Sequence, residues 1–135
     1  MSRAAVRLAA FVSLLVLPAC EQIPNVPPTA SFIFSPVSPI NAGQTGVVFN
    51  ASASRDSDGK INSYVWNFGD GTPEQTSDGP VIAHLFPDTP ATCLTIIYGV
   101  LLTTVDDAGE RGTASQNVTV TELPAPSSQA CQLPR

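Results

Sequence analysis

The strongest structural signal in the sequence is Asn62-Ser63-Tyr64-Val65-Trp66-Asn67-Phe68-Gly69-Asp70-Gly71. The aromatic residues Tyr64, Trp66 and Phe68 occupy every second position, and alternate side chains of a β-strand point to the same face. We therefore expect a strand that contributes an aromatic face to a core. Gly69-Asp70-Gly71 then ends the strand, because glycine accepts a positive φ and an Asp carboxylate can bond nearby backbone N–H groups.

Other strand-like runs lie on both sides of this stretch and are separated by polar or Pro- and Gly-containing turns. They are residues 30–35, 46–54, 81–86, 93–106 and 113–121. Short strands divided by turn signals are typical of two packed sheets, so we predict an all-β sandwich of about seven strands. In the run 46–54 we expect Val48 to point inward. Leu94–Leu102 is too short to span a bilayer and is interpreted as a buried strand.

Composition excludes two classes of function. The chain has 135 residues with a net charge of −5, and two of its six basic residues, Arg3 and Arg7, lie near the N-terminus. No basic patch is left to bind phosphates, so we expect no nucleic-acid partner. His84 is the chain's one histidine, and no nucleophile motif or cofactor loop accompanies it. We therefore predict no enzymatic activity and a structural His84, either buried or bonded to a neighbouring strand.

The N-terminal residues have the pattern of an export signal, with Arg3 and Arg7 before a short apolar segment. Leu17-Pro18-Ala19-Cys20 resembles the bacterial lipobox, although Pro18 departs from the usual small or β-branched residue. The resemblance implies a signal peptide of residues 1–19 and a lipid on Cys20; the alternative is an ordinary cleaved signal with an incidental cysteine. By the same resemblance, Glu21 favours the outer membrane over the inner one, on either the periplasmic or the cell-surface side.

Two Pro-rich segments flank the expected domain. Residues 20–28 are predicted to form a semi-stiff tether that holds the domain off the membrane, and residues 122–135 a Pro- and Ser-rich tail. If Cys20 carries the lipid, Cys93 and Cys131 remain as a pair in an oxidising compartment. We expect a disulfide between them that ties the tail to the segment around Cys93; two free thiols are the alternative.

With the strands placed, several segments resemble the PKD (polycystic kidney disease) repeat. They are residues 28–32, 51–59, the central stretch 64–71, 84–86 and 105–109. The resemblance implies an immunoglobulin-like β-sandwich, here residues 29–121, found outside cells as a spacer or a module for protein or polysaccharide contact, without catalysis. Asn67 replaces the usual Asp, and Pro87–Ile97 is longer than the corresponding family segment.

Asp56 and Asp58 precede Gly59 in a polar turn and could contribute oxygen ligands to Ca²⁺, with Asp70 or Asp106-Asp107 completing the site. The alternative is a solvated turn held by local side-chain hydrogen bonds, with no cofactor. Trp66 could stack on a sugar, but its place in the strand pattern favours the core.

The sequence thus favours a non-enzymatic envelope lipoprotein whose PKD-like module contacts other proteins. Two alternatives are a carbohydrate-binding module, which exposed aromatic residues would support, and a subunit of a larger envelope complex that buries Leu94–Leu102. We expect the partners to be the membrane, through the lipid, and envelope proteins or polysaccharide.

Overall fold

The computed structural model of the protein describes residues 23–88 and 95–121. This part of the chain forms strands and no helix, so none of it could cross a membrane as a helix. Its strands are β1 (Ile33–Ser35), β2 (Ile40–Asn41), β3 (Gly46–Asn50), β4 (Ile61–Asn67), β5 (Gln75–Ser77), β6 (Val81–Leu85), β7 (Thr95–Asp106) and β8 (Arg111–Thr121).

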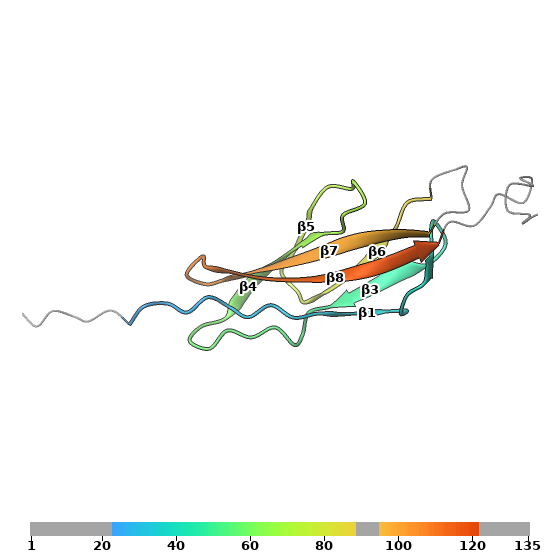
Figure 1. Ribbon diagram of the computed structural model, residues 1–135. Helices are drawn as coiled ribbons and strands as arrows, with labels where there is room; N and C mark the ends of the chain where they lie inside the picture. The colour runs from blue at the N-terminus through green and yellow to red at the C-terminus, as the bar shows by residue number, and fades with distance from the viewer. Residues whose placement is uncertain (1–22, 89–94, 122–135) are drawn as a thin grey trace, which may run out of the picture.

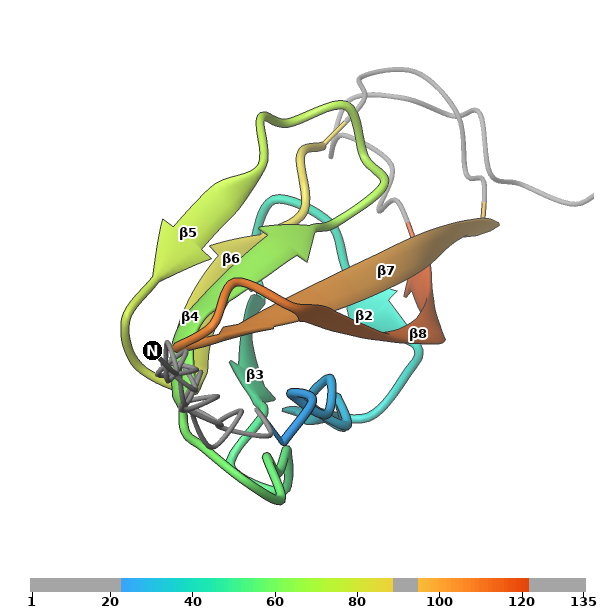
Figure 2. The ribbon, with the colours of Figure 1, turned by 90° about the vertical axis from the view of Figure 1, so that its left-hand side faces the viewer.

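The strands form two sheets, which Figures 1 and 2 show as separate layers. One has three strands in the order β1-β3-β6, and the other has five in the order β2-β8-β7-β4-β5. All pairs are antiparallel except β2 with β8. The predicted immunoglobulin-like β-sandwich is confirmed.

Aromatic side chains from both sheets fill the space between the layers. Trp66 on β4 is fully buried and packs edge-on against Phe32, with ring centroids 5.3 Å apart. Phe49 on β3 lies 5.7 Å from Trp66 and 5.2 Å from Phe68. Tyr64 is also buried, so the aromatic alternation in β4 does build the core. Trp66 is therefore a core residue and no sugar-stacking platform.

The turn after β4 has the conformation that its glycines predict. Gly69 and Gly71 have φ of 72° and 85°, a region that side chains rarely adopt. A Cβ on Gly69 would also come within 2.6 Å of the backbone oxygen of Gly99, on β7. The turn can therefore approach the neighbouring strand only because residue 69 lacks a side chain.

Three sequence expectations differ from the structure. Val48 points outward and is 44% exposed, while Val47 and Phe49 are buried. Three consecutive apolar residues mark no face, and pairing with β1 and β6 selects the odd-numbered pair for the core. The run 46–54 is a strand only to Asn50, and two short strands, β2 and β5, were not expected. Finally, the described part of the Leu94–Leu102 run, residues 95–102, is buried on one face only: Val100 and Leu102 point inward, whereas Ile97 is 63% exposed.

Candidate functional site

The outer face of the three-stranded sheet is apolar. It carries four exposed aliphatic side chains: Ile33 on β1, Val48 on β3, and Val81 and Leu85 on β6. They are 44–68% exposed, and none of the three strands contains Asp, Glu, Lys or Arg. We call these four residues and the exposed Ala83 the apolar face.

Strand register places these side chains in neighbouring rows of one face. Ile33 pairs with Asn50, which pairs with Val81. Val48 lies between Ser35 and Ala83 in the next row. The strand alternation that buries Phe49 and His84 therefore sends the aliphatic side chains to the opposite side, which they share with the uncharged Asn50 and Ser35.

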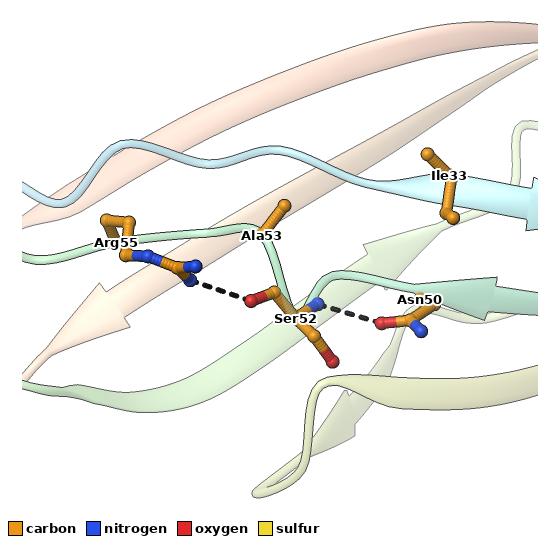
Figure 3. Close-up of a pocket in the computed structure, with 5 residues that line it drawn as sticks. All are labelled: Ile33, Asn50, Ser52, Ala53 and Arg55. Atoms are coloured by element: carbon orange, nitrogen blue, oxygen red, sulfur yellow. Dashed lines mark hydrogen bonds between the residues drawn. The ribbon is translucent and has the colours of Figure 1, made fainter.

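A groove of about 300 Å³ continues the apolar face at one end. Its lining residues are drawn in Figure 3: Ile33, Asn50, Ser52, Ala53 and Arg55. Nη1 of Arg55 donates hydrogen bonds to the carbonyl oxygens of Ser52 (2.7 Å) and Ser54 (2.8 Å), which fixes the guanidinium beside the groove. Arg55 has no carboxylate partner within the described residues, where His84–Asp70 is the one ion pair.

The outer face of the five-stranded sheet is more polar than the apolar face. Ile97 and Leu101 are its exposed large apolar residues, and their partners on β8 are Thr119 and Ser115. Between them Gly99 pairs with Asn117. The two aliphatic side chains are therefore separated by polar positions, and the exposed part of the Leu94–Leu102 run forms a weaker patch than the apolar face.

His84 is buried beneath the apolar face and contacts the turn that follows β4. Its Nε2 lies 2.6 Å from Oδ2 of Asp70, and its ring stacks on Phe68 at a centroid distance of 3.7 Å. Asp70 also accepts hydrogen bonds from the backbone N–H and the hydroxyl of Thr72, at 3.0 and 2.6 Å. The structural interpretation of His84 is confirmed, although its partner belongs to a turn instead of a strand.

Burial and hydrogen bonding act on the pKa of the Asp70 carboxyl in opposite directions. Burial raises its pKa, but hydrogen bonds from Thr72 and His84 together outweigh burial and hold the pKa below its usual value. The pair is enclosed by packed rings, with the side chains of His84 and Asp70 only 5% and 0% exposed. We therefore assign it a structural role, joining the Gly69–Gly71 turn to β6.

The acidic turns meet at one end of the sandwich. Oδ1 of Asp107 accepts a hydrogen bond from the backbone of Lys60 (3.2 Å), and the carboxylates of Asp107 and Asp56 both adjoin Gly59. Oδ2 of Asp56 is buried without a hydrogen-bond partner. Asp58 does not join them, because its Oδ2 accepts from the backbone of Val26 (2.9 Å).

Of the other residues considered for calcium, Asp70 is bonded to His84 in the core. Asp106 lies at this end, but its two carboxylate oxygens accept hydrogen bonds from Asn25 and from the N–H groups of Ala108 and Glu110. Within residues 23–88 and 95–121, no three His, Cys, Asp or Glu side chains are arranged to hold a metal ion. Calcium at Asp56 and Asp58 stays a prediction, and a calcium titration of thermal stability with Asp56→Asn as control would test it.

Residues 25–29, which we call the strap, lie against this same end. Nδ2 of Asn25 donates to Oδ2 of Asp106 at 2.7 Å. Thr29 and Arg55 exchange two backbone hydrogen bonds, at 2.7 and 3.0 Å. Most of the strap was expected to belong to the free tether 20–28, and four of those residues instead dock on the domain.

Several sequence predictions fall outside the described residues: the signal peptide, the lipid site at Cys20, the Cys93–Cys131 disulfide, and the tail 122–135. The aromatic platform expected of a sugar-binding module is not present among the described residues, whose Phe, Tyr and Trp side chains are all buried or half-buried. Neither the groove nor the apolar face was predicted from the sequence, although the uncharged composition of β1, β3 and β6 was a usable signal.

Comparison with known proteins gives the family. The model of the PKD domain matches residues 25–121. The chain therefore belongs to the PKD domain family. PKD domains are generally non-catalytic modules and occur in extracellular or secreted proteins. The match begins at Asn25, the first strap residue that bonds to the sandwich.

The chain is similar to parts of several known proteins, of which three are described. Collagenase ColQ1 of Bacillus cereus (strain Q1) is 37% identical over 75 residues, which are 56% of this chain and 7% of the collagenase. The PKD1 domain of the Vibrio cholerae metalloprotease PrtV is 30% identical, with a TM-score of 0.52 over 70% of this chain and 98% of that domain.

A third relative is a solved structure described as the structural basis for the promiscuous specificity of carbohydrate-binding modules of the β-sandwich superfamily. It is 36% identical, with a TM-score of 0.65 over 79% of this chain and 39% of that chain. The PKD chain thus spans a small part of the collagenase and well under half of this structure.

Proposed function

We propose that the protein is a non-enzymatic contact module of the cell envelope, and that a partner protein binds its apolar face. The observation that supports this proposal is the group of exposed aliphatic side chains at positions 33, 48, 81 and 85 on one face of an uncharged sheet. Contiguous apolar patches on soluble proteins mark interaction sites, because their exposure to water is unfavourable.

The chemistry of the face favours a protein partner with a similarly apolar surface. Its strands contain no Asp, Glu, Lys or Arg that binding would have to desolvate. Burying apolar surface therefore stabilises the complex without the cost of burying unpaired ions. Within the described residues, the one histidine is buried in the core, where its ring contacts Asp70 and Phe68. The apolar face is therefore the feature of the described surface on which we base a contact function.

The proposal includes a location for the module at the membrane. A lipid on Cys20, if the lipobox acts as it does in the proteins it resembles, would hold the module at the membrane, and Glu21 favours the outer membrane. The mode of action is then tethering: the anchor fixes the position of the module, and the apolar face binds a neighbouring envelope protein.

Crosslinking in whole cells tests the proposal. The wild-type chain should co-purify with a defined protein, and Cys20→Ser should lose it because the module is no longer positioned at the membrane. Val48→Lys should lose the same protein, since it places a charge in the centre of the apolar face. The matched control is Asn117→Lys on the outer face of the other sheet. Equal recovery with Val48→Lys and with the wild type would contradict the proposal.

A second candidate function is carbohydrate binding, which the likeness to the carbohydrate-binding-module structure favours. The groove at Arg55 is the site that suits it, because it combines polar side chains with an aliphatic wall. Recovery of envelope polysaccharide without a stoichiometric protein in the same crosslinking experiment would place this candidate first.

A further inference from the structure

The groove at the end of the apolar face contains a cation whose position is fixed but whose charge is unpaired. Two carbonyl oxygens, of Ser52 and Ser54, hold Nη1 of Arg55 at 2.7 and 2.8 Å. Guanidinium has five N–H donors in a planar fork, so these bonds leave others free. In a chain with a net charge of −5, an arginine fixed by carbonyl oxygens and not by a carboxylate is prepared to receive an external anion.

The polar groups that share the groove with Arg55 also offer donors. Oδ1 of Asn50 accepts the backbone N–H of Ser52 at 2.9 Å, which orients the amide so that its NH₂ group is the free end. The Ser52 hydroxyl can donate as well. The groove therefore presents donors to a ligand rich in acceptor oxygens.

The rest of the groove is lined by two aliphatic side chains, Ile33 and Ala53. Ile33 is 68% exposed and lies with Asn50 at one end of the groove, Arg55 lies at the other end, and Ala53 and Ser52 lie between them (Figure 3). The volume of about 300 Å³ is at the lower limit of small-molecule sites. That size suits one sugar ring, with its C–H face on Ile33 and Ala53 and its oxygens toward the donors.

We propose that this groove binds a carboxylate-bearing sugar, a uronic acid unit of a polysaccharide, with the carboxylate on Arg55 and ring oxygens on Asn50 and Ser52. The proposal rests on the second candidate function above and specifies its ligand. An acidic peptide side chain would satisfy Arg55 alone and leave the Asn50 and Ser52 donors unused. A neutral sugar would leave the Arg55 charge without a counterion.

The test uses the full chain carrying Cys20→Ser, which leaves every described residue unchanged. Trigalacturonate is titrated while ¹H–¹⁵N NMR follows the Asn50 amide, the Ser52 N–H and the Arg55 Nε–H, with the methyl ester of the same trimer as the neutral control. We expect saturable shifts at these three groups with the acid, weaker binding of the ester, and loss of affinity as ionic strength rises.

Asn50→Asp is the decisive variant. The carboxylate retains the acceptor for the Ser52 N–H and nearly the same shape, but it replaces the NH₂ donor with a negative charge beside the ligand. Affinity should fall by about tenfold or more, since like charges are brought together and a hydrogen bond is lost. Arg55→Gln should have a similar effect, and Arg111→Gln, which removes an exposed cation at the start of β8, should have none.

Each other outcome overturns the inference in a distinguishable way. Equal binding of acid and ester would contradict carboxylate recognition while leaving carbohydrate binding in place. Shifts with triglutamate and none with trigalacturonate would make the ligand a peptide. Unchanged affinity in Asn50→Asp would place the ligand elsewhere on the domain. If neither sugar binds, the inference fails. The second candidate is then decided by the recovery of envelope polysaccharide in the crosslinking experiment, and the protein-contact function by the Val48→Lys variant.

Discussion

Asp70 connects the Gly69–Gly71 turn to the core through two sets of partners, His84 on one side and Thr72 on the other. Because its pKa is lower in the folded protein than in the unfolded chain, the carboxylate contributes stability above its unfolded pKa of about 3.9. That contribution is lost as the pH falls through the folded pKa. Acid should therefore weaken the domain below about pH 4.

Asp70→Asn tests this account of acid sensitivity. The amide keeps an acceptor for Thr72 and a donor for His84, so the variant should fold, with a loss on the order of 1 kcal/mol at neutral pH because charged hydrogen bonds become neutral ones. Urea unfolding between neutral and acidic pH should show a shallower decrease in stability than the wild type. Asp78→Asn, at an exposed turn, is the control. Parallel curves for Asp70→Asn and the wild type would show that Asp70 is not responsible.

The strap is the element that the sequence placed incorrectly. Prolines and low apolar content predict an extended segment, and residues 25–29 are extended, but their contacts come from Asp106 and Arg55, distant in sequence. Gly112 on β8 makes the docking possible: a Cβ there would overlap the backbone oxygen of Pro28.

Gly112→Ala should therefore displace the strap. We expect a loss of about 1–3 kcal/mol of stability, as for other overpacked positions, with faster amide exchange or proteolysis confined first to residues 25–29. Gly46→Ala is the matched control, since a Cβ there would meet nothing within 4 Å. If both variants behave alike, the close approach at Pro28 does not hold the strap.

Elements marked by alternation and by turn residues could be predicted from the sequence. The aromatic strand, its Gly-Asp-Gly turn and the hairpin at Asp106–Gly109 all follow from local chemistry. Carboxylate Oδ1 of Asp106 in fact accepts the N–H groups of Ala108 and Glu110, as such a turn requires. Val48 could not be oriented because its neighbours are equally apolar. The two-residue β2 is created by pairing with β8, which no local signal announces.

The candidate site could be predicted from the sequence even less than the fold. The groove depends on register between β1 and β3, which brings Ile33 opposite Asn50, and on a turn that folds Arg55 back to the carbonyl of Ser52. These are relations between distant segments. The sequence could indicate that β1, β3 and β6 lack charge, but not that their outward residues form one face.

At the scale of the whole molecule, the strap limits how far the domain can stand from a lipid on Cys20. Asn25 lies five positions after Cys20, and an extended chain spans at most about 3.6 Å per residue. The end of the sandwich that binds the strap would then lie within roughly 18 Å of the anchor. The 36–39 connection between β1 and β2 lies at the other end of the domain in Figure 1 and would face away from the membrane.

The chain's one tryptophan can measure this distance. Trp66 in the lipidated protein should transfer energy to a dansyl headgroup in vesicles, and inserting about twelve Gly and Ser residues after residue 22 should reduce transfer, because it adds roughly 20 Å of reach. Prior detergent partitioning confirms that both forms carry lipid. Unchanged transfer after the insertion would mean that the segment between Cys20 and Asn25 does not set the position of the domain.

Site-specific photo-crosslinking in living cells tests most directly whether the apolar face binds an envelope protein. Benzoylphenylalanine replaces Val48 or Val81 on the apolar face, and Asn117 on the outer face of the five-stranded sheet serves as the control position. We predict that positions 48 and 81 give an adduct with the same envelope protein and that position 117 gives none. Adducts of equal yield from both faces, or none from positions 48 and 81, would contradict the assignment of the apolar face as the contact surface.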